Sequence, residues 1–170
     1  LVTRRTLRWS HTFGLGGSAL VLVATLALSG LALMLHYQPA PDGAYRSVLS
    51  LEQDVAFGPL VRGVHWWSAN LLLAAVLLHT ARVLVTGGWH GPRRFNWLVG
   101  CALLGVVLTG AFTGYLLPLD QLAYWAVTIA TGMLAYVPVV GEVLRRVVLG
   151  GPETGGDSLV VFYAVHTSIV

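Results

Sequence analysis

Charged side chains are scarce in this sequence. Only 10% of its 170 residues are Asp, Glu, Lys or Arg, whereas 56% are hydrophobic and the mean hydropathy is +0.75. These values lie outside the range of soluble globular domains. We therefore predict an integral membrane protein, and the small formal charge of +3 gives no indication of nucleic-acid binding.

Cysteine is almost absent, and the features of a cleaved signal peptide are missing too. Cys101 is the only cysteine, which excludes disulfides and cysteine-rich metal sites within the chain. The first apolar run, from Phe13 to about Leu35, is longer than the hydrophobic region of a signal peptide and lacks a clear small-residue cleavage site. We expect this run to be a retained membrane helix.

Long runs without any charged residue define the membrane spans. Three of them, within 11–45, at 63–81 and at 95–119, are long enough to cross a hydrocarbon core. A fourth apolar run begins at Ser158, and its thirteen residues to the chain end would rise only about 20 Å as a helix. The predicted fold class is all-α: a single domain over 1–170 that forms a polytopic transmembrane four-helix bundle with a truncated fourth span. The spans are expected at about 13–36, 62–86, 96–117 and 158–170.

Proline and glycine separate these spans. The segment "YQPAPDG" is typical of a helix end followed by a turn. Between the third and fourth spans, the sequence predicts two short helices at about 120–149, divided by "VPVVG". The aromatic residues Tyr124, Trp125 and Tyr136 suit the membrane interface, so we expect a helical hairpin on the outer surface of the bilayer. Simple anchoring of the chain would also explain these aromatics.

The two sides of the predicted bundle differ in charge. One side has only basic residues: Arg4, Arg5, Arg8, Arg82, Arg93 and Arg94. The other side has all seven acids: Asp42, Glu52, Asp54, Asp120, Glu142, Glu153 and Asp157. The positive-inside rule then predicts a cytoplasmic N-terminus, in the cell inner membrane or another energy-transducing membrane.

Two histidines lie inside the otherwise apolar second span. His65 and His79 are fourteen positions apart, which on a helix is a rise of roughly 21 Å and a rotation about 40° short of four turns. Both rings therefore leave the helix on nearly the same side, one near each membrane face. A buried imidazole needs a partner, and haem is the usual metal group at depth in a bilayer. His166 would reach the depth of His65, whereas a partner for His79 would lie about fourteen residues past His166, beyond the chain end.

Glycines repeat the same spacing of fourteen. The pairs are Gly16 with Gly30 in the first span and Gly100 with Gly114 in the third. Because consecutive spans alternate in direction, the later glycine of each pair shares the outer level with His65, and the earlier one shares the inner level with His79. A flat macrocycle edge can approach a helix backbone closely only where no Cβ is present. Helix packing is the alternative role for such glycines.

Arginines flank the two histidines. Arg62 precedes His65 by three positions and Arg82 follows His79 by three, so each lies one turn toward water from its histidine. An arginine at that place would pair with a haem propionate. Both arginines would also serve as residues that extend to the interface at the ends of a span.

Four segments together resemble the cytochrome b family, the membrane core of quinol-oxidising bc-type and bf-type complexes. They are "VRGVHWWSAN", "LLHTARVLVTGGWHGPR", "TGYLLPLDQLAYWAVTIATG" and "FYAVHTSIV", and they look most like the split photosynthetic form, cytochrome b-six. The resemblance implies two b-type haems: an outer, low-potential haem held by His65 and His166, and an inner, high-potential haem held by His79 and a ligand beyond residue 170. It also implies that the four glycines contact the haems. The implied propionate partners are Arg62, Arg82 and Arg93.

The resemblance also assigns a role to the hairpin. The segment after Pro118 would form part of the outer quinol-oxidation pocket, with Tyr124, Ala126 and Val127 matching the motif. The split form attaches an extra haem through a cysteine where this chain has Leu22, so no thioether-linked haem is expected there. Leu119 replaces a tryptophan of the family pattern.

The leading hypothesis is a dihaem electron-transfer subunit of a quinol-oxidising membrane complex. Quinol would be oxidised at the outer face, with one electron passing to an iron-sulfur partner and the other crossing inward through the haems. The chain would act as an enzyme only as a subunit, in a homodimeric complex with a Rieske-type protein, a c-type cytochrome and a chain or segment carrying the other half of the quinol pocket. Two alternatives stay open: a non-bifurcating dihaem anchor of another quinone-linked oxidoreductase, and a haem-free structural membrane subunit.

Overall fold

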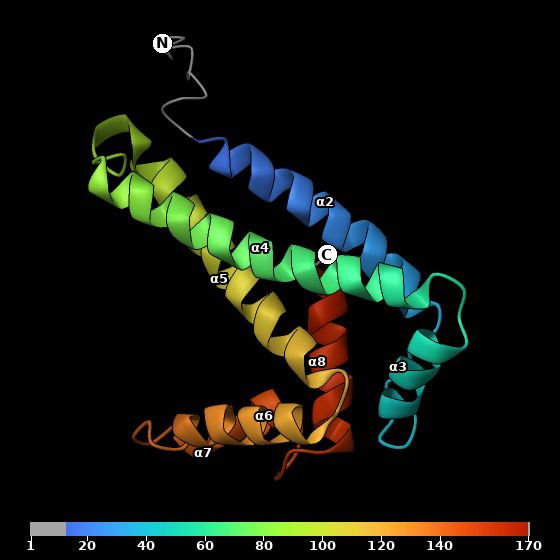
Figure 1. The fold of residues 1–170 in the computed structure, drawn as a ribbon. Helices are drawn as coiled ribbons and strands as arrows, with labels where there is room; N and C mark the ends of the chain where they lie inside the picture. Colours follow the sequence, from blue (N-terminus) through green and yellow to red (C-terminus); the bar gives the residue numbers. More distant parts are fainter. Residues whose placement is uncertain (1–12, 170) are drawn as a thin grey trace.

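The computed structural model describes residues 13–169, and the regular secondary structure in this range is entirely helical (Figure 1). Its elements are α2 (Leu15–Met34), α3 (Ala44–Gln53), α4 (Gly58–Val85), the 3-10 turn η1 (Gly91–Arg93), α5 (Arg94–Leu116), α6 (Gln121–Leu134), α7 (Gly141–Leu149) and α8 (Gly156–Ile169). The predicted all-α fold class is confirmed. The N-terminal arginines used for the orientation, Arg4, Arg5 and Arg8, lie outside the described residues.

Three helical segments are long and apolar enough to cross a membrane. They are Leu15–Met34, Gly58–Val85 and Gly91–Leu116, and most of their apolar side chains are exposed on this chain. Helices whose outer faces contact lipid have this pattern, because hydrocarbon solvates apolar side chains as well as a protein core does. The three predicted long spans are therefore confirmed.

The second span begins four residues earlier than predicted, at Gly58. Phe57 caps the helix with a φ of 61°, and Pro59 occupies the first turn, where its missing N–H costs nothing. Gly58 itself is buried against the end of α3, where an added Cβ would lie 1.8 Å from the carbonyl oxygen of Leu51. This close approach explains why glycine starts the helix.

Helix α3 was not predicted from the sequence. It is a short amphipathic helix in the first outer connection, and its buried residues Ala44, Ser47 and Leu51 recur at helical spacing. The Ser47 hydroxyl oxygen also accepts a hydrogen bond from the backbone N–H of Gln38 at 3.2 Å, which holds the preceding loop. Helix α3 packs against the first turns of α4.

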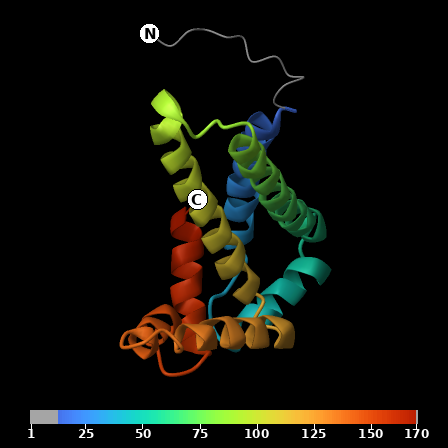
Figure 2. The same cartoon turned by 90° about the vertical axis from the view of Figure 1, so that its left-hand side faces the viewer.

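The predicted hairpin is present as α6 and α7. The Asp120 side chain caps α6 by accepting a hydrogen bond from the N–H of Ala123 at 2.8 Å. A buried cluster joins the hairpin to the ends of α5 and α8; its members are Leu116, Ala123, Val127, Leu149 and Phe162. Figure 2 shows the hairpin lying across one end of the helices.

The bundle consists of two helix pairs. Helix α2 runs along α4, and α5 runs along α8, with fewer contacts between α4 and α5 (Figures 1 and 2). The histidine-bearing helices α4 and α8 thus belong to different pairs. Any contact between their histidines therefore joins the two pairs.

Candidate haem-binding site

The rings of His65 and His166 lie close to each other across the bundle. Their centroids are 6.2 Å apart and their planes make an angle of 65°. An imidazole nitrogen binds a metal ion at about 2.0 Å, so two imidazoles on opposite sides of one ion have ring centres about 6 Å apart. The separation of these two rings therefore fits two imidazoles that would hold one haem iron.

A hydrogen bond from helix α2 orients the ring of His65. Its Nδ1 atom lies 3.0 Å from the Ser29 hydroxyl oxygen. The Ser29 hydroxyl donates to the carbonyl oxygen of Thr25 at 2.6 Å, which leaves the serine oxygen to accept a proton from Nδ1. Nε2 of His65 is then the unprotonated nitrogen, the form that a metal ligand requires.

Helix α5 orients the ring of His166 in the same way. Nδ1 of His166 lies 3.0 Å from the carbonyl oxygen of Gly110 and 3.3 Å from the Thr113 hydroxyl oxygen. Thr113 donates its own proton to the carbonyl oxygen of Thr109 at 2.8 Å. Both neighbours of Nδ1 are acceptors, so Nδ1 carries the proton and Nε2 is free to bind iron. The chemistry of this donor pair fits bis-histidine haem ligation.

His79 lies at the opposite level of α4 and is half-buried. Within residues 13–169, its buried Nδ1 atom has no hydrogen-bond partner. Buried polar atoms without a partner are rare in proteins and often mark functional positions. This atom supports His79 as part of a second cofactor position, for which the described residues supply one histidine.

Three of the four glycines lie directly against these imidazole rings. An added Cβ would lie 2.6 Å from Cε1 of His166 at Gly114, 3.3 Å from Cε1 of His65 at Gly30, and 3.6 Å from Cε1 of His79 at Gly16. The predicted pairing of glycine and histidine levels is present in the structure. The space beside each glycine holds the imidazole ring itself, whereas the sequence argument had placed a macrocycle edge there. Nothing lies within 4 Å of a Cβ added at Gly100.

The three predicted propionate partners differ in their surroundings. Arg62 forms an ion pair with Glu52 of α3. Arg82 is half-buried in the last turn of α4, and Arg93 is exposed in η1. Among the described residues, no acidic side chain pairs with Arg82 or Arg93. Their role at a propionate stays a prediction.

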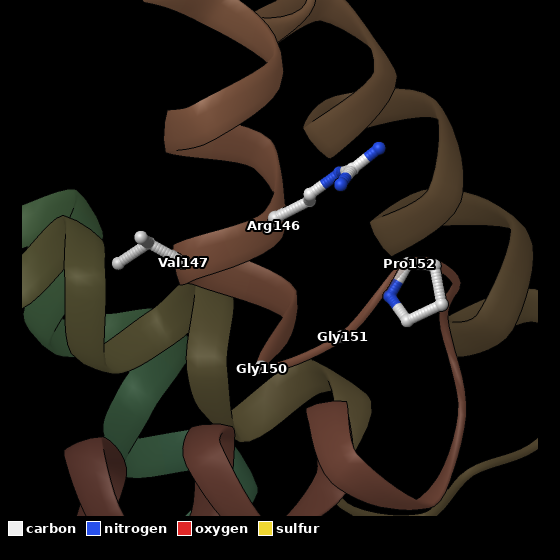
Figure 3. A pocket seen from close by; sticks show the side chains of 5 residues that line it. All are labelled: Arg146, Val147, Gly150, Gly151 and Pro152. Atoms are coloured by element: carbon white, nitrogen blue, oxygen red, sulfur yellow. The ribbon is translucent and has the colours of Figure 1, made fainter.

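The predicted quinone-pocket residues occupy one turn of α6 but face different environments. Val127 is fully buried in the cluster that joins the hairpin to α5 and α8. Ala126 is half-buried, and the half-buried Tyr124 ring packs edge-on against Trp125 with a centroid distance of 5.3 Å. An open hollow of about 500 Å³ lies at the end of α7 (Figure 3). Its lining residues are Arg146, Val147, Gly150, Gly151 and Pro152, so it is separate from the predicted pocket.

Tyr37 connects the C-terminal end of α2 to α5 and α8. Its hydroxyl donates to the carbonyl oxygen of Leu117 at 2.6 Å, at the end of α5. Its ring packs against Tyr163 of α8 with a centroid distance of 5.4 Å. Burial raises the pKa of Tyr37 above its usual range, and the neighbouring Tyr163 raises it further. One side chain thereby connects three helices of the bundle.

Sequence reasoning missed the hydroxyl groups that contact the outer histidines. Ser29 directly precedes Gly30, and Thr113 directly precedes Gly114. The available signal was a hydroxyl residue immediately before each outer-level glycine. On a helix, adjacent residues point about 100° apart, so a glycine can face the ring while the residue before it reaches the ring nitrogen.

Comparison with known proteins gives consistent matches over this whole region. A family model described as Cytochrome b/b6/petB matches residues 4–170. The cytochromes b6 of Heliobacterium mobile and Heliomicrobium gestii are each 41% identical over 165 residues, covering 95% of this chain and 78% of each relative. Cytochrome b6 of Prochlorococcus marinus (strain MIT 9303) is 40% identical over 156 residues, covering 92% of this chain and 72% of that protein. A chain from a "Hyperthermophilic respiratory Complex III" has a TM-score of 0.82 at 31% identity; the match covers 93% of this chain but 43% of that chain, less than half of its length.

Proposed function

This chain belongs to the cytochrome b family, and from that premise we propose that it is the dihaem b-type subunit of a quinol-oxidising membrane complex of the bc or b6f type. The observation that carries the proposal is the pair of outer imidazoles, 6.2 Å apart. Each ring has an acceptor on a neighbouring helix for its Nδ1–H, which leaves Nε2 as the unprotonated nitrogen that a metal ligand requires.

The histidines divide between two haem positions. His65 and His166 would hold the iron of the outer haem, and His79 would supply one ligand of the inner haem. Haem supplies reversible one-electron chemistry when it is bound. The chain holds the ligand rings at fixed levels of the bundle, and the glycines beside them leave room for the rings. Leu22 excludes a thioether attachment at that position.

The hairpin provides one wall of the outer quinol pocket. Tyr124 and Ala126 are the partly exposed residues of this α6 turn, and Val127 supports them from the buried cluster. The other wall comes from a separate chain or segment, and a Rieske-type protein and a c-type cytochrome accept the electron that leaves at the outer face. The complex is a homodimer. The side with Arg82, Arg93 and Arg94 is cytoplasmic, in agreement with the positive-inside rule.

The test is a redox titration of the native membrane complex, followed by difference spectra in the haem region. We expect two b-type waves, with one lost in His65→Ala and the other lost in His79→Ala. His90→Ala is the matched control, because His90 is an exposed histidine of the connecting loop whose ring stacks on Trp89. Both waves should persist in this control. A native complex without any b-type signal would contradict the proposal and favour a structural membrane subunit.

A quinol-oxidation assay separates the bifurcating complex from a simple dihaem anchor. In a bifurcating complex, quinol reduces the b haems through the outer pocket only while the iron-sulfur partner is present and oxidised. In a membrane anchor without bifurcation, quinol reduces the b haems after that partner has been removed. The second result would leave the haem assignments in place and overturn the proposed complex type.

A further inference from the structure

Each of the two outer histidines has a hydroxyl side chain near its Nδ1 atom. The fourteen-residue repeat does not place such a hydroxyl at the inner level. Ser29 and Thr113 each precede a haem-level glycine, and each places a hydroxyl oxygen near Nδ1 of a ligand ring, at 3.0 Å and 3.3 Å. Each hydroxyl proton is directed at a carbonyl of its own helix, at 2.6 Å and 2.8 Å. Both oxygens are therefore oriented as acceptors for the ring N–H.

The inner level keeps the glycines but not the hydroxyls. Fourteen residues before Ser29 is Leu15, and fourteen residues before Thr113 is Val99. Leucine and valine carry no hydrogen-bonding group on their side chains. In agreement with this difference, Nδ1 of His79 has no hydrogen-bond partner among residues 13–169. Leu15 and Val99 thus cannot provide at the inner level the acceptors that Ser29 and Thr113 provide at the outer level.

This difference has a direct consequence for a redox metal. An imidazole that donates its Nδ1–H to an acceptor becomes a more basic ligand at Nε2. A more basic ligand stabilises the more highly charged, oxidised iron over the reduced iron. The equilibrium in which oxidised iron takes up one electron then shifts toward the oxidised side, and the reduction potential falls.

We propose that Ser29 and Thr113 are positioning residues that hold the outer ligands in the Nδ1-protonated form and thereby set the outer haem at a lower potential than the inner haem. The inference deepens the proposed function and rests on it. With this ordering, an electron that enters at the outer face moves inward toward the site of higher potential. Ser29 and Thr113, which precede Gly30 and Gly114, thus help to determine the direction of electron transfer across the bilayer.

Ser29→Ala in the native complex is the first test. The variant removes the hydroxyl acceptor beside Nδ1 of His65 and should raise the reduction equilibrium constant of the lower-potential haem by about tenfold, which is about 59 mV for a one-electron couple. The higher-potential wave should not move. Thr25→Ala is the matched control, since its hydroxyl bonds the carbonyl oxygen of Val21 at 2.9 Å, one turn along the same helix. Ser29→Thr keeps a hydroxyl and should restore the original potential.

Thr113→Val tests the acceptor on the other side of the outer site. His166 keeps the Gly110 carbonyl oxygen at 3.0 Å in this variant. The shift should have the same direction as in Ser29→Ala, because a hydroxyl acceptor is lost beside Nδ1 in both variants. A shift in the opposite direction would contradict the proposed acceptor arrangement.

Leu15→Ser tests the inference by adding the missing hydroxyl at the inner level. This variant should lower the higher-potential wave and leave the other in place, and it decides the question if Ser29→Ala fails to assemble with haem. Retained haems with both waves unmoved in Ser29→Ala and Leu15→Ser would overturn the inference. An equal shift of both waves, or the same shift in Thr25→Ala, would show a general structural effect and overturn it as well. Absence of b-type signal in the unaltered complex would instead refute the proposed function.

Discussion

The ring of His166 lies so close to Gly114 that a methyl group on Gly114 would clash with it. A Cβ at this position would lie 2.6 Å from Cε1 and 3.1 Å from Nδ1 of the ring. The corresponding distances to the nearest ring atom are 3.3 Å at Gly30 and 3.6 Å at Gly16. A side chain is therefore least tolerable at Gly114, and the crowding that it would cause decreases from Gly114 to Gly30 to Gly16.

Gly114→Ala should displace His166 and reduce the amount of outer haem. Overpacking of this kind costs about 1–3 kcal/mol, and here the strain acts on a ligand ring. We expect at least half of the lower-potential haem to be lost, measured as the haem-to-protein ratio together with the redox titration. Gly17→Ala on α2 is the control, because nothing lies within 4 Å of the added Cβ. Full haem content in Gly114→Ala would show that the ring can move aside without losing iron.

Tyr37→Phe should weaken the outer end of the bundle. The variant removes the bond to the Leu117 carbonyl oxygen and leaves that oxygen without its donor, at a cost of about 1–2 kcal/mol. Thermal denaturation of the complex should therefore begin at a lower temperature. Tyr136→Phe is the control, since the Tyr136 side chain is 88% exposed. Equal melting of both variants would exclude an anchoring role for Tyr37.

The pH dependence of this anchor follows from the raised pKa of Tyr37. A phenol whose pKa is higher in the folded state than in the unfolded chain contributes stability below the unfolded value of about 10, and loses it as pH rises further. The stability difference between the native chain and Tyr37→Phe should thus be constant from neutral pH to about pH 10 and shrink above it. Melting curves at several pH values measure this difference. A difference that shrinks below pH 9 would contradict the raised pKa.

At the scale of single elements, charge-free length was enough to predict the long helices. The runs around α2, α4 and α5 exceed the hydrocarbon thickness, so no competing structure satisfies their backbone groups in lipid. Helix α3 has only ten residues, includes Arg46 and Glu52, and follows a proline-rich turn. Its formation depends on packing against α4, which local patterns do not report.

The sequence was enough to predict which candidate histidines and glycines share a level of the bundle. The number of residues between two positions of a helix determines how far apart they lie along its axis. For this reason Gly16, Gly30 and Gly114 were correctly predicted to lie at the same depths as their histidines. The Ser29 contact depends on how α2 is rotated against α4, and the Gly110 contact depends on how α5 lies against α8. Rotation between helices is set by side-chain packing, and a sequence repeat does not specify it.

At the scale of the whole molecule, the hairpin and the histidine-bearing bundle meet at one buried cluster. Leu149 of α7 is fully buried there beside Leu116 of α5 and Phe162 of α8. The histidine contacts lie elsewhere on α4, α5 and α8 and include no residue of the hairpin. The hairpin is therefore joined to the bundle by packing at this cluster and makes none of the cited contacts to the histidine rings.

Leu149→Ala should separate quinol oxidation from haem binding. The substitution removes a buried side chain and costs about 2–5 kcal/mol of packing, which loosens α7 and the α6 turn against the bundle. We expect quinol oxidation to fall at least tenfold, while dithionite still reduces both b haems and their potentials stay unchanged. Val147→Ala is the control on the same helix, because its side chain is 68% exposed. Loss of the outer haem along with quinol oxidation would contradict this separation, since it would mean that the hairpin also supports the ring of His166. Undiminished quinol oxidation in Leu149→Ala would instead show that the outer pocket tolerates a mobile hairpin, and Tyr124 and Ala126 would then lose their proposed place in its wall.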